Sequence, residues 1–188
     1  MGKYQIDLLQ LHKYFIRNHL HEGDTAVDYT MGNGHDTLWL SRALGERGHV
    51  YAFDIQPSAI ASTEKTLADG GAYDNCTLIC DSHANAGKYV NEKICIGVFN
   101  LGYLPGSDKK ITTMRKTTMP AIEAAVSLLD RDGILLVAVY PGHAEGDAEG
   151  KMVCEYFATL PRTQYCATRI QILNSPTSPY FIVIEKKA

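Results

Sequence analysis

Four short polar segments each follow an apolar stretch of the chain, and their residue types could bind a nucleoside cofactor. In the first, residues 28–37 (D-Y-T-M-G-N-G-H-D-T), Gly32 and Gly34 allow a tight backbone turn that approaches a ligand closely. Thr37 replaces the third glycine of the dinucleotide fingerprint, which argues against a nicotinamide cofactor. An acidic residue four positions before the first glycine suits a methionine-derived nucleoside, so we expect Asp28 to hold its ammonium group, directly or through water. A turn that binds no ligand is the alternative.

Each of the next two apolar stretches ends in a carboxylate. Asp54 lies 20 residues beyond Gly34, where a carboxylate can accept hydrogen bonds from both ribose hydroxyls. We expect Asp81 to accept a hydrogen bond from the exocyclic amine of adenine, and Ser82 can add a contact. The alternative role of both carboxylates is to cap the helix that follows. Their occurrence together with the glycine turn favours the cofactor interpretation.

The fourth segment, F-N-L-G-Y-L-P-G, indicates what kind of atom is modified. Many enzymes that methylate nitrogen carry N-P-P-Y or D-P-P-Y at this position. Asn100 and Tyr103 match the outer letters, while Leu101 and Gly102 replace the two prolines. We expect Asn100 to accept a hydrogen bond from a substrate nitrogen and to aim its lone pair, and Tyr103 to pack on a planar base. These two are the candidate catalytic residues.

Four basic residues follow this loop, namely Lys109, Lys110, Arg115 and Lys116. They could contact RNA phosphates beside the site, and an ordinary solvated helix face is the alternative. The net charge of −3 excludes a globally basic nucleic-acid-binding protein. Any contact with RNA must therefore come from a local patch of this kind.

No metal site is predicted. His35, His83 and His143 have no close helical spacing and no acidic cluster beside them, and the five cysteines include no C-x-x-C pair. We therefore expect reduced thiols. The longest apolar run, Ile134 to Tyr140, is too short to span a membrane, and the charged N-terminus is unlike a secretory signal. A cytoplasmic protein is expected.

Hydrophobic periodicity predicts helices that alternate with strands. The expected helices cover residues 4–20, 36–44, 57–67, 111–129 and 148–159. The expected strands cover residues 26–29, 49–53, 77–80, 94–99 and 134–139, followed by a terminal pair at 164–173 and 180–185. The alternation implies right-handed βαβ units. We expect one α/β domain over residues 1–188, with a Rossmann-like, seven-stranded, mostly parallel sheet, an antiparallel terminal hairpin, and the N-terminal helix of residues 1–22 packed on it.

The strings D-Y-T-M-G-N-G-H-D-T-L, F-D-I-Q, D-S-H and F-N-L-G-Y-L-P-G-S-D-K resemble the MnmM/YtqB-like family, long labelled putative rRNA methylases. The similarity runs nearly end to end. These class I methyltransferases use S-adenosylmethionine to methylate the 5-aminomethyl group of wobble 2-thiouridine in tRNA. The resemblance implies the same cofactor, a tRNA anticodon stem-loop as partner, and a homodimer. One departure is Ala144, which stands where the family has proline and leaves a substrate role of His143 open.

The segments and the resemblance together give one set of predicted cofactor-binding residues. They are Asp28, Thr30, Gly32, Asn33, Gly34, His35, Asp54, Gln56, Asp81, Ser82, Asn100 and Gly102. The resemblance places Asn100, Gly102 and Tyr103 beside the transferred methyl group. The implied reaction is displacement by a neutral amine, which needs orientation more than a strong base. Methylation of rRNA or of a small-molecule amine is one alternative, and a non-catalytic nucleotide-cofactor-binding protein is another.

Overall fold

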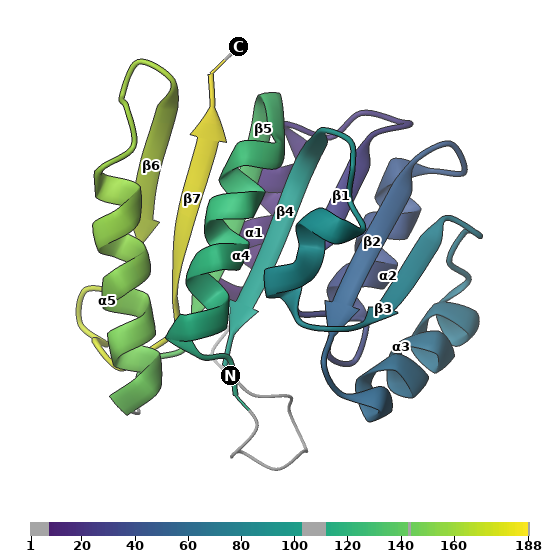
Figure 1. The fold of residues 1–188 in the computed structure, drawn as a ribbon, viewed down its shortest axis with the longest axis horizontal. Coiled ribbons are helices and arrows are strands. Elements are labelled where there is room, and N and C mark those ends of the chain that lie inside the picture. Colours follow the sequence, from purple (N-terminus) through teal and green to yellow (C-terminus); the bar gives the residue numbers. More distant parts are fainter. Residues whose placement is uncertain (1–7, 103–111, 143, 188) are drawn as a thin grey trace.

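The centre of the computed structural model is a seven-stranded β-sheet with the order β3-β2-β1-β4-β5-β7-β6 (Figure 1). The structure describes residues 8–102, 112–142 and 144–187. The strands are β1 (Thr25–Asp28), β2 (His49–Asp54), β3 (Cys76–Cys80), β4 (Ile94–Leu101), β5 (Leu129–Val139), β6 (Tyr165–Ile170) and β7 (Tyr180–Lys186). Strands β1 to β5 pair in parallel, whereas β7 pairs antiparallel with both β5 and β6. The predicted parallel core with an antiparallel terminal hairpin is therefore confirmed.

Helices cover both faces of this sheet. They are α1 (Leu8–Arg17), α2 (His35–Leu44), α3 (Pro57–Gly70), the short 3-10 helix η1 (His83–Lys88), α4 (Arg115–Leu128) and α5 (Ala144–Ala158). Helices α1 and α2 lie on one face, and α4, η1 and α5 lie on the other (Figure 1). Ile16 of α1 and Leu40 of α2 share a buried cluster with Val50 and Val98, so both helices pack against the sheet. No helix of the described ranges is long and apolar enough to cross a membrane.

Helix α4, strand β5 and helix α5 begin four or five residues away from the starts that the sequence predicts. Helix α5 begins earlier, at Ala144 and not at Ala148. The helix expected from Ile111 begins at Arg115, because the residues just before it are extended. The backbone N–H of Thr113 donates a hydrogen bond to the carbonyl of Gly102 at 2.9 Å, which ties this segment to the end of β4. Strand β5 begins earlier than expected, at Leu129, through an irregular stretch, and its second half is the predicted strand.

Three aromatic rings support the carboxyl ends of the central strands. Tyr29 stacks on Phe99 with ring centroids 4.1 Å apart, and it lies nearly parallel to Phe53 at 6.2 Å. All three rings are buried. Stacked aromatic pairs add about 0.5–1.5 kcal/mol beyond the area that they bury. The stack fixes the ends of β1, β2 and β4 side by side, and this brings the polar segments that follow these strands to one edge of the sheet.

Candidate active site

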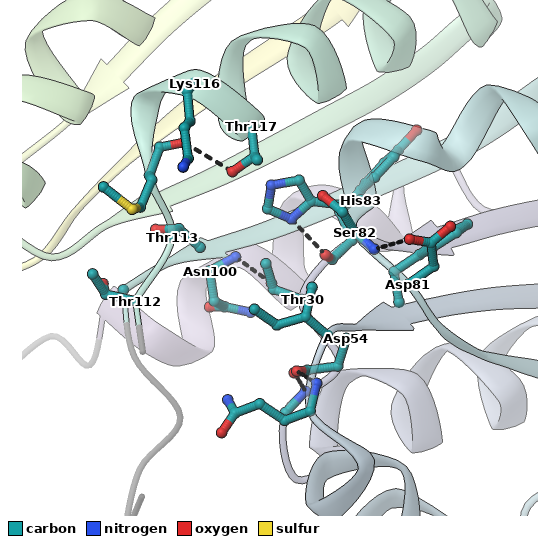
Figure 2. A pocket seen from close by; sticks show the side chains of 17 residues that line it. Thr30, Asp54, Asp81, Ser82, His83, Asn100, Thr112, Thr113, Lys116 and Thr117 are labelled. Carbon is teal, nitrogen blue, oxygen red and sulfur yellow. Dashed lines mark hydrogen bonds between the residues drawn. The ribbon is translucent and has the colours of Figure 1, made fainter. Parts of the chain in front are cut away.

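A cavity of about 380 Å³ lies at the carboxyl ends of β1 to β4 (Figure 2). Its volume is typical of sites for small molecules. Residues that the sequence predicts as cofactor-binding form one side of it, namely Thr30, Gly32, Asp54, Gln56, Asp81, Ser82, Asn100 and Gly102. Residues that the sequence analysis did not select form much of the rest, including Ile55, His83, Thr112, Thr113, Met114 and Thr117. The structure therefore brings the four polar segments together around one cavity.

The glycine turn after β1 is held against α3. Gly34 has φ 78°, and a Cβ atom there would lie 2.8 Å from Cγ2 of Thr63, so a larger residue would be both strained and crowded. The hydroxyl of Thr63 donates to the carbonyl of Gly32 at 3.1 Å. The hydroxyl of Ser62 donates to Oδ1 of Asn33 at 2.9 Å. Asn33 and Gly34 thus serve the contact with α3 and do not line the cavity.

Asp54 ties this turn to the end of β2. Its Oδ2 accepts a hydrogen bond from the N–H of Gly32 at 3.2 Å, and its Oδ1 accepts one from the N–H of Gln56 at 2.9 Å. Partial burial raises the pKa of Asp54. Each carboxylate oxygen has more than one lone pair, so Asp54 can hold the turn and still accept hydrogen bonds from a ligand diol.

Asp28 is fully buried beneath the turn and does not line the cavity. Its Oδ2 accepts a hydrogen bond from the hydroxyl of Thr37 at 2.7 Å, and its Oδ1 accepts one from the N–H of Thr30 at 3.1 Å. Burial, with the nearby negative charge of Asp36, raises the pKa of Asp28 to about 7. The structure gives Asp28 a part in holding the turn, and a contact with a ligand ammonium group stays a prediction.

Asp81 is oriented by its own neighbours at the end of β3. Its carboxylate accepts hydrogen bonds from the side-chain amide of Asn85, from the N–H of Ser82 and from the hydroxyl of Tyr89. The Asn85 bond, followed by the other two, lowers the pKa of Asp81. The hydroxyl of Ser82 accepts from the N–H of Ala84 and caps η1. The cap of η1 is therefore Ser82 and not Asp81, the residue predicted as the alternative cap, and both residues line the cavity.

Asn100 is fixed at two points in the cavity wall. Its backbone N–H donates to Oγ1 of Thr30 at 2.7 Å (Figure 2). Its side-chain Nδ2 donates to Oδ2 of Asp36 at 3.0 Å. Asp36 belongs to the first polar segment, but no role was predicted for it. Its contact with Asn100 joins residues 64 positions apart, and no local sequence pattern indicates such a contact.

The first turn of α4 forms the wall opposite the strand ends. Behind it, the buried carboxylate of Glu149 accepts hydrogen bonds from the hydroxyls of Thr113 and Thr118 at 2.7 and 2.5 Å. Lys116 is exposed and lines the cavity. Arg115 forms a two-point ion pair with Glu145, at 3.1 and 3.2 Å. This ion pair occupies the guanidinium group that the sequence predicts to contact RNA phosphates.

His83 is a further cavity residue that the sequence analysis considered only as a metal ligand. The residue is 9% exposed, and its Nδ1 lies 3.2 Å from the carbonyl oxygen of Tyr29. Because a carbonyl only accepts, Nδ1 carries the proton of this bond. Burial lowers the pKa of His83, which favours the neutral ring. In the described ranges, no three His, Cys, Asp or Glu residues are grouped as metal ligands.

Of the remaining predicted site residues, one lies away from the cavity and three fall outside the described residues. His35 is exposed at the start of α2 and does not line the cavity. Tyr103, Lys109 and Lys110 lie outside the described residues.

The cavity fits a positively charged nucleoside better than a dinucleotide. Asp54 and Asp81 line it with carboxylates that can accept hydrogen bonds, and Ile55, which is 56% exposed, adds an apolar surface. Burial is the main cause of the raised pKa of Asp28, and the negative charges of Asp36 and Asp54 raise it further. These three carboxylates therefore lie close together. A cation bound beside this group of carboxylates would be stabilised.

Comparisons of the sequence with known proteins find methylases. The sequence profile of a family described as "Putative rRNA methylase" matches residues 50–186. The "tRNA (mnm(5)s(2)U34)-methyltransferase, chloroplastic" of Arabidopsis thaliana is 36% identical over 178 residues, which cover 89% of this chain and 65% of that protein. The chain thus spans just under two thirds of the length of this curated relative.

Solved structures give the same picture at the level of the fold. A putative rRNA methylase from Clostridium thermocellum is 38% identical, with a TM-score of 0.93 over 97% of this chain and 98% of that one. A putative methyltransferase from Streptococcus mutans, in complex with SAH, is 35% identical, with a TM-score of 0.87 over 97% of this chain and 99% of that one. The fold is therefore that of class I S-adenosylmethionine-dependent methyltransferases.

The buried carboxyl of Asp28 predicts how stability depends on pH. An aspartate titrates near pH 3.9 in the unfolded chain, and in the fold its pKa is about 7. Between these values the folded protein binds the proton more tightly, so the contribution of this group to the free energy of unfolding falls as pH rises from about 4 to about 7. We expect Asp28→Asn to remove this fall, as measured by urea unfolding across that pH range.

Asp69→Asn is the matched control, because Asp69 is exposed near the end of α3. It should keep the wild-type dependence on pH. A wild-type protein that grows more stable, relative to Asp28→Asn, as pH rises through this range would contradict the burial argument.

Proposed function

The chain belongs to the family described as putative rRNA methylases, and from this premise we propose that it transfers a methyl group from S-adenosylmethionine to the 5-aminomethyl group of wobble uridine in tRNA. The relative from Arabidopsis thaliana supports this substrate, since its name specifies a methylaminomethyl-thiouridine at position 34 of tRNA. The observation that carries the proposal is the orientation of Asn100, whose amide nitrogen is bound by Asp36. Its amide oxygen is then left to accept an N–H from an amine.

The cofactor is assigned to the strand-end side of the cavity. Asp54 binds the ribose diol, Asp81 and Ser82 bind the adenine edge, and Ile55 packs on the base, while Gly32 brings the turn close to the methionine part. The solved structure from Streptococcus mutans supports this assignment, since it holds SAH in the same fold. When bound, S-adenosylmethionine supplies a methyl group on a positively charged sulfur.

The protein's own residues act mainly by orientation. Asn100 holds the acceptor nitrogen with its lone pair toward the methyl group, and fixed positioning of this kind can supply up to about 7–11 kcal/mol of the barrier. An alkylammonium group near pKa 10.4 costs about 4–5 kcal/mol to neutralise at pH 7, and desolvation in the cavity together with the cationic cofactor lowers that cost. Tyr103 is proposed to pack on the uracil ring.

The RNA is proposed to approach over the first turn of α4. Lys116 is exposed and lines the cavity at this turn. We propose Lys109 and Lys110 as further phosphate contacts. Arg115 contributes less than the sequence suggests, because Glu145 already binds its guanidinium. The homodimer and the cytoplasmic location stay predictions from the sequence.

Cofactor binding tests the role of Asp54. Replacing Asp54 with alanine removes charged hydrogen bonds worth about 1.5–3 kcal/mol, so we expect affinity for SAH to fall by roughly 10- to 150-fold in calorimetry. Asp54→Asn keeps an oxygen for the turn and should lose less. His35→Ala should change affinity little, because His35 lies outside the cavity. Equal affinities of wild type and Asp54→Ala would exclude this ribose contact.

Wobble-nucleoside analysis tests the substrate. Incubation of the protein with S-adenosylmethionine and tRNA bearing 5-aminomethyl-2-thiouridine should convert that nucleoside to its N-methyl form, detected by mass spectrometry after digestion. Asn100→Ala should bind SAH normally but lose roughly 100-fold in rate, as expected for a misplaced acceptor. Unchanged wobble uridine, with methylation found instead in rRNA or a free amine, would refute the proposed substrate.

A further inference from the structure

The carboxylate of Asp36 lies directly behind Asn100. Its Oδ2 accepts the hydrogen bond from Nδ2 of Asn100 at 3.0 Å. Asp36 is in the first turn of α2, where the helix macrodipole stabilises a negative charge. Burial raises the pKa of Asp28 and of Tyr140, and the charge of Asp36 adds to the rise in both. The negative charge of Asp36 therefore acts on groups on more than one side of Asn100.

This hydrogen bond decides which end of the Asn100 amide faces the cavity. A carboxylate can only accept, so the amide nitrogen must face Asp36. The backbone of Asn100 is fixed as well, because its N–H donates a hydrogen bond to Oγ1 of Thr30 at 2.7 Å. Asn100 therefore presents its amide oxygen, Oδ1, as the acceptor in the cavity wall.

Methyl transfer to an amine makes such an oriented oxygen useful. The lone pair of the acceptor nitrogen forms the new N–C bond while the C–S bond breaks, and the electron pair of that bond stays on sulfur. The positive charge thus passes from sulfur to nitrogen, and a proton leaves the nitrogen to water afterwards. A hydrogen-bond acceptor aimed at the atom where charge develops lowers the barrier. A carboxylate bonded to the far end of the same amide makes its oxygen more negative.

We propose that Asp36 is a positioning residue of the methyl transfer, which orients and polarises the Asn100 amide so that Oδ1 accepts an N–H of the acceptor amine. The inference rests on the proposed function for the identity of that amine. It also assigns a selectivity, since the acceptor nitrogen must carry a hydrogen to donate. A tertiary amine or a ring carbon would leave Oδ1 desolvated without a partner, which is unfavourable.

Asp36→Asn in the full chain tests this role, because it keeps the size of the side chain and removes the charge that fixes the amide. Under saturating S-adenosylmethionine, we expect kcat for the methylated RNA to fall roughly 10- to 100-fold, the range for loss of a charged hydrogen bond. Affinity for SAH and KM for the RNA should change less than about threefold, within the scatter of surface substitutions. Asp69→Asn on the exposed face of α3 is the control and should match wild type.

A double-mutant cycle separates positioning from a general structural effect. If Asp36 acts through Asn100, then Asp36→Asn should have no further effect in the Asn100→Ala background, because residues that act as a unit are not additive. Full activity of Asp36→Asn, or a loss that multiplies with that of Asn100→Ala, would overturn the inference.

A measurement without substrate keeps the inference separate from the proposed function. In the SAH complex of the wild type, the side-chain amide NMR signal of Asn100, identified by its absence in Asn100→Ala, should show one strongly hydrogen-bonded N–H. This feature should shift in Asp36→Asn. An amide signal like that of a solvent-exposed asparagine would overturn the inference even if tRNA is the substrate. If another RNA is methylated, the proposed substrate fails, and the same variants are compared on that RNA.

Discussion

The site depends on the backbone of the turn between β1 and α2, which must be fixed at the edge of the sheet in a conformation that leaves the cavity accessible. Asp54 holds it from β2 by bonding the N–H of Gly32, and Thr63 holds it from α3 by bonding the carbonyl of the same glycine. A residue with a Cβ atom at position 34 would collide with Thr63, so glycine there is a requirement of packing. Because the short turn is hydrogen-bonded from two sides, its backbone is fixed and still leaves room for a ligand beside it.

Charge is the second organising feature of the site. Asp28, Asp36 and Asp54 surround the turn, and burial with mutual repulsion raises the pKa of Asp28 to about 7. Grouped carboxylates are unfavourable in a protein that binds nothing there. They become favourable when the ligand carries a sulfonium and an ammonium group, and when the reaction passes positive charge to a nitrogen beside Asn100. The same group of acids would repel the phosphates of a dinucleotide.

The sequence predicted the sheet and the gathering of the polar segments at one edge of it, because both follow from local patterns. Apolar stretches that alternate with helices predict the strands, and the carboxyl ends of parallel strands meet at one edge of the sheet. The sequence therefore predicts that Asp54, Asp81 and Asn100 lie near one another. Contacts between distant segments could not be predicted. The burial of Asp28 under Thr37, the pairing of Arg115 with Glu145, and the orientation of Asn100 by Asp36 all depend on how helices pack on the sheet. The start of α4 was misplaced for the same reason, because a hydrogen bond to Gly102 ties Thr113 to the end of β4 and Met114 is extended.

A crystal structure of this chain with SAH would show directly which residues hold the cofactor. We expect the ribose hydroxyls within hydrogen-bond distance of the Asp54 carboxylate, the adenine over Ile55 with its amine at Asp81, and the sulfur on the side of Asn100. SAH bound away from these strand ends, or absent at concentrations that saturate related methyltransferases, would contradict it.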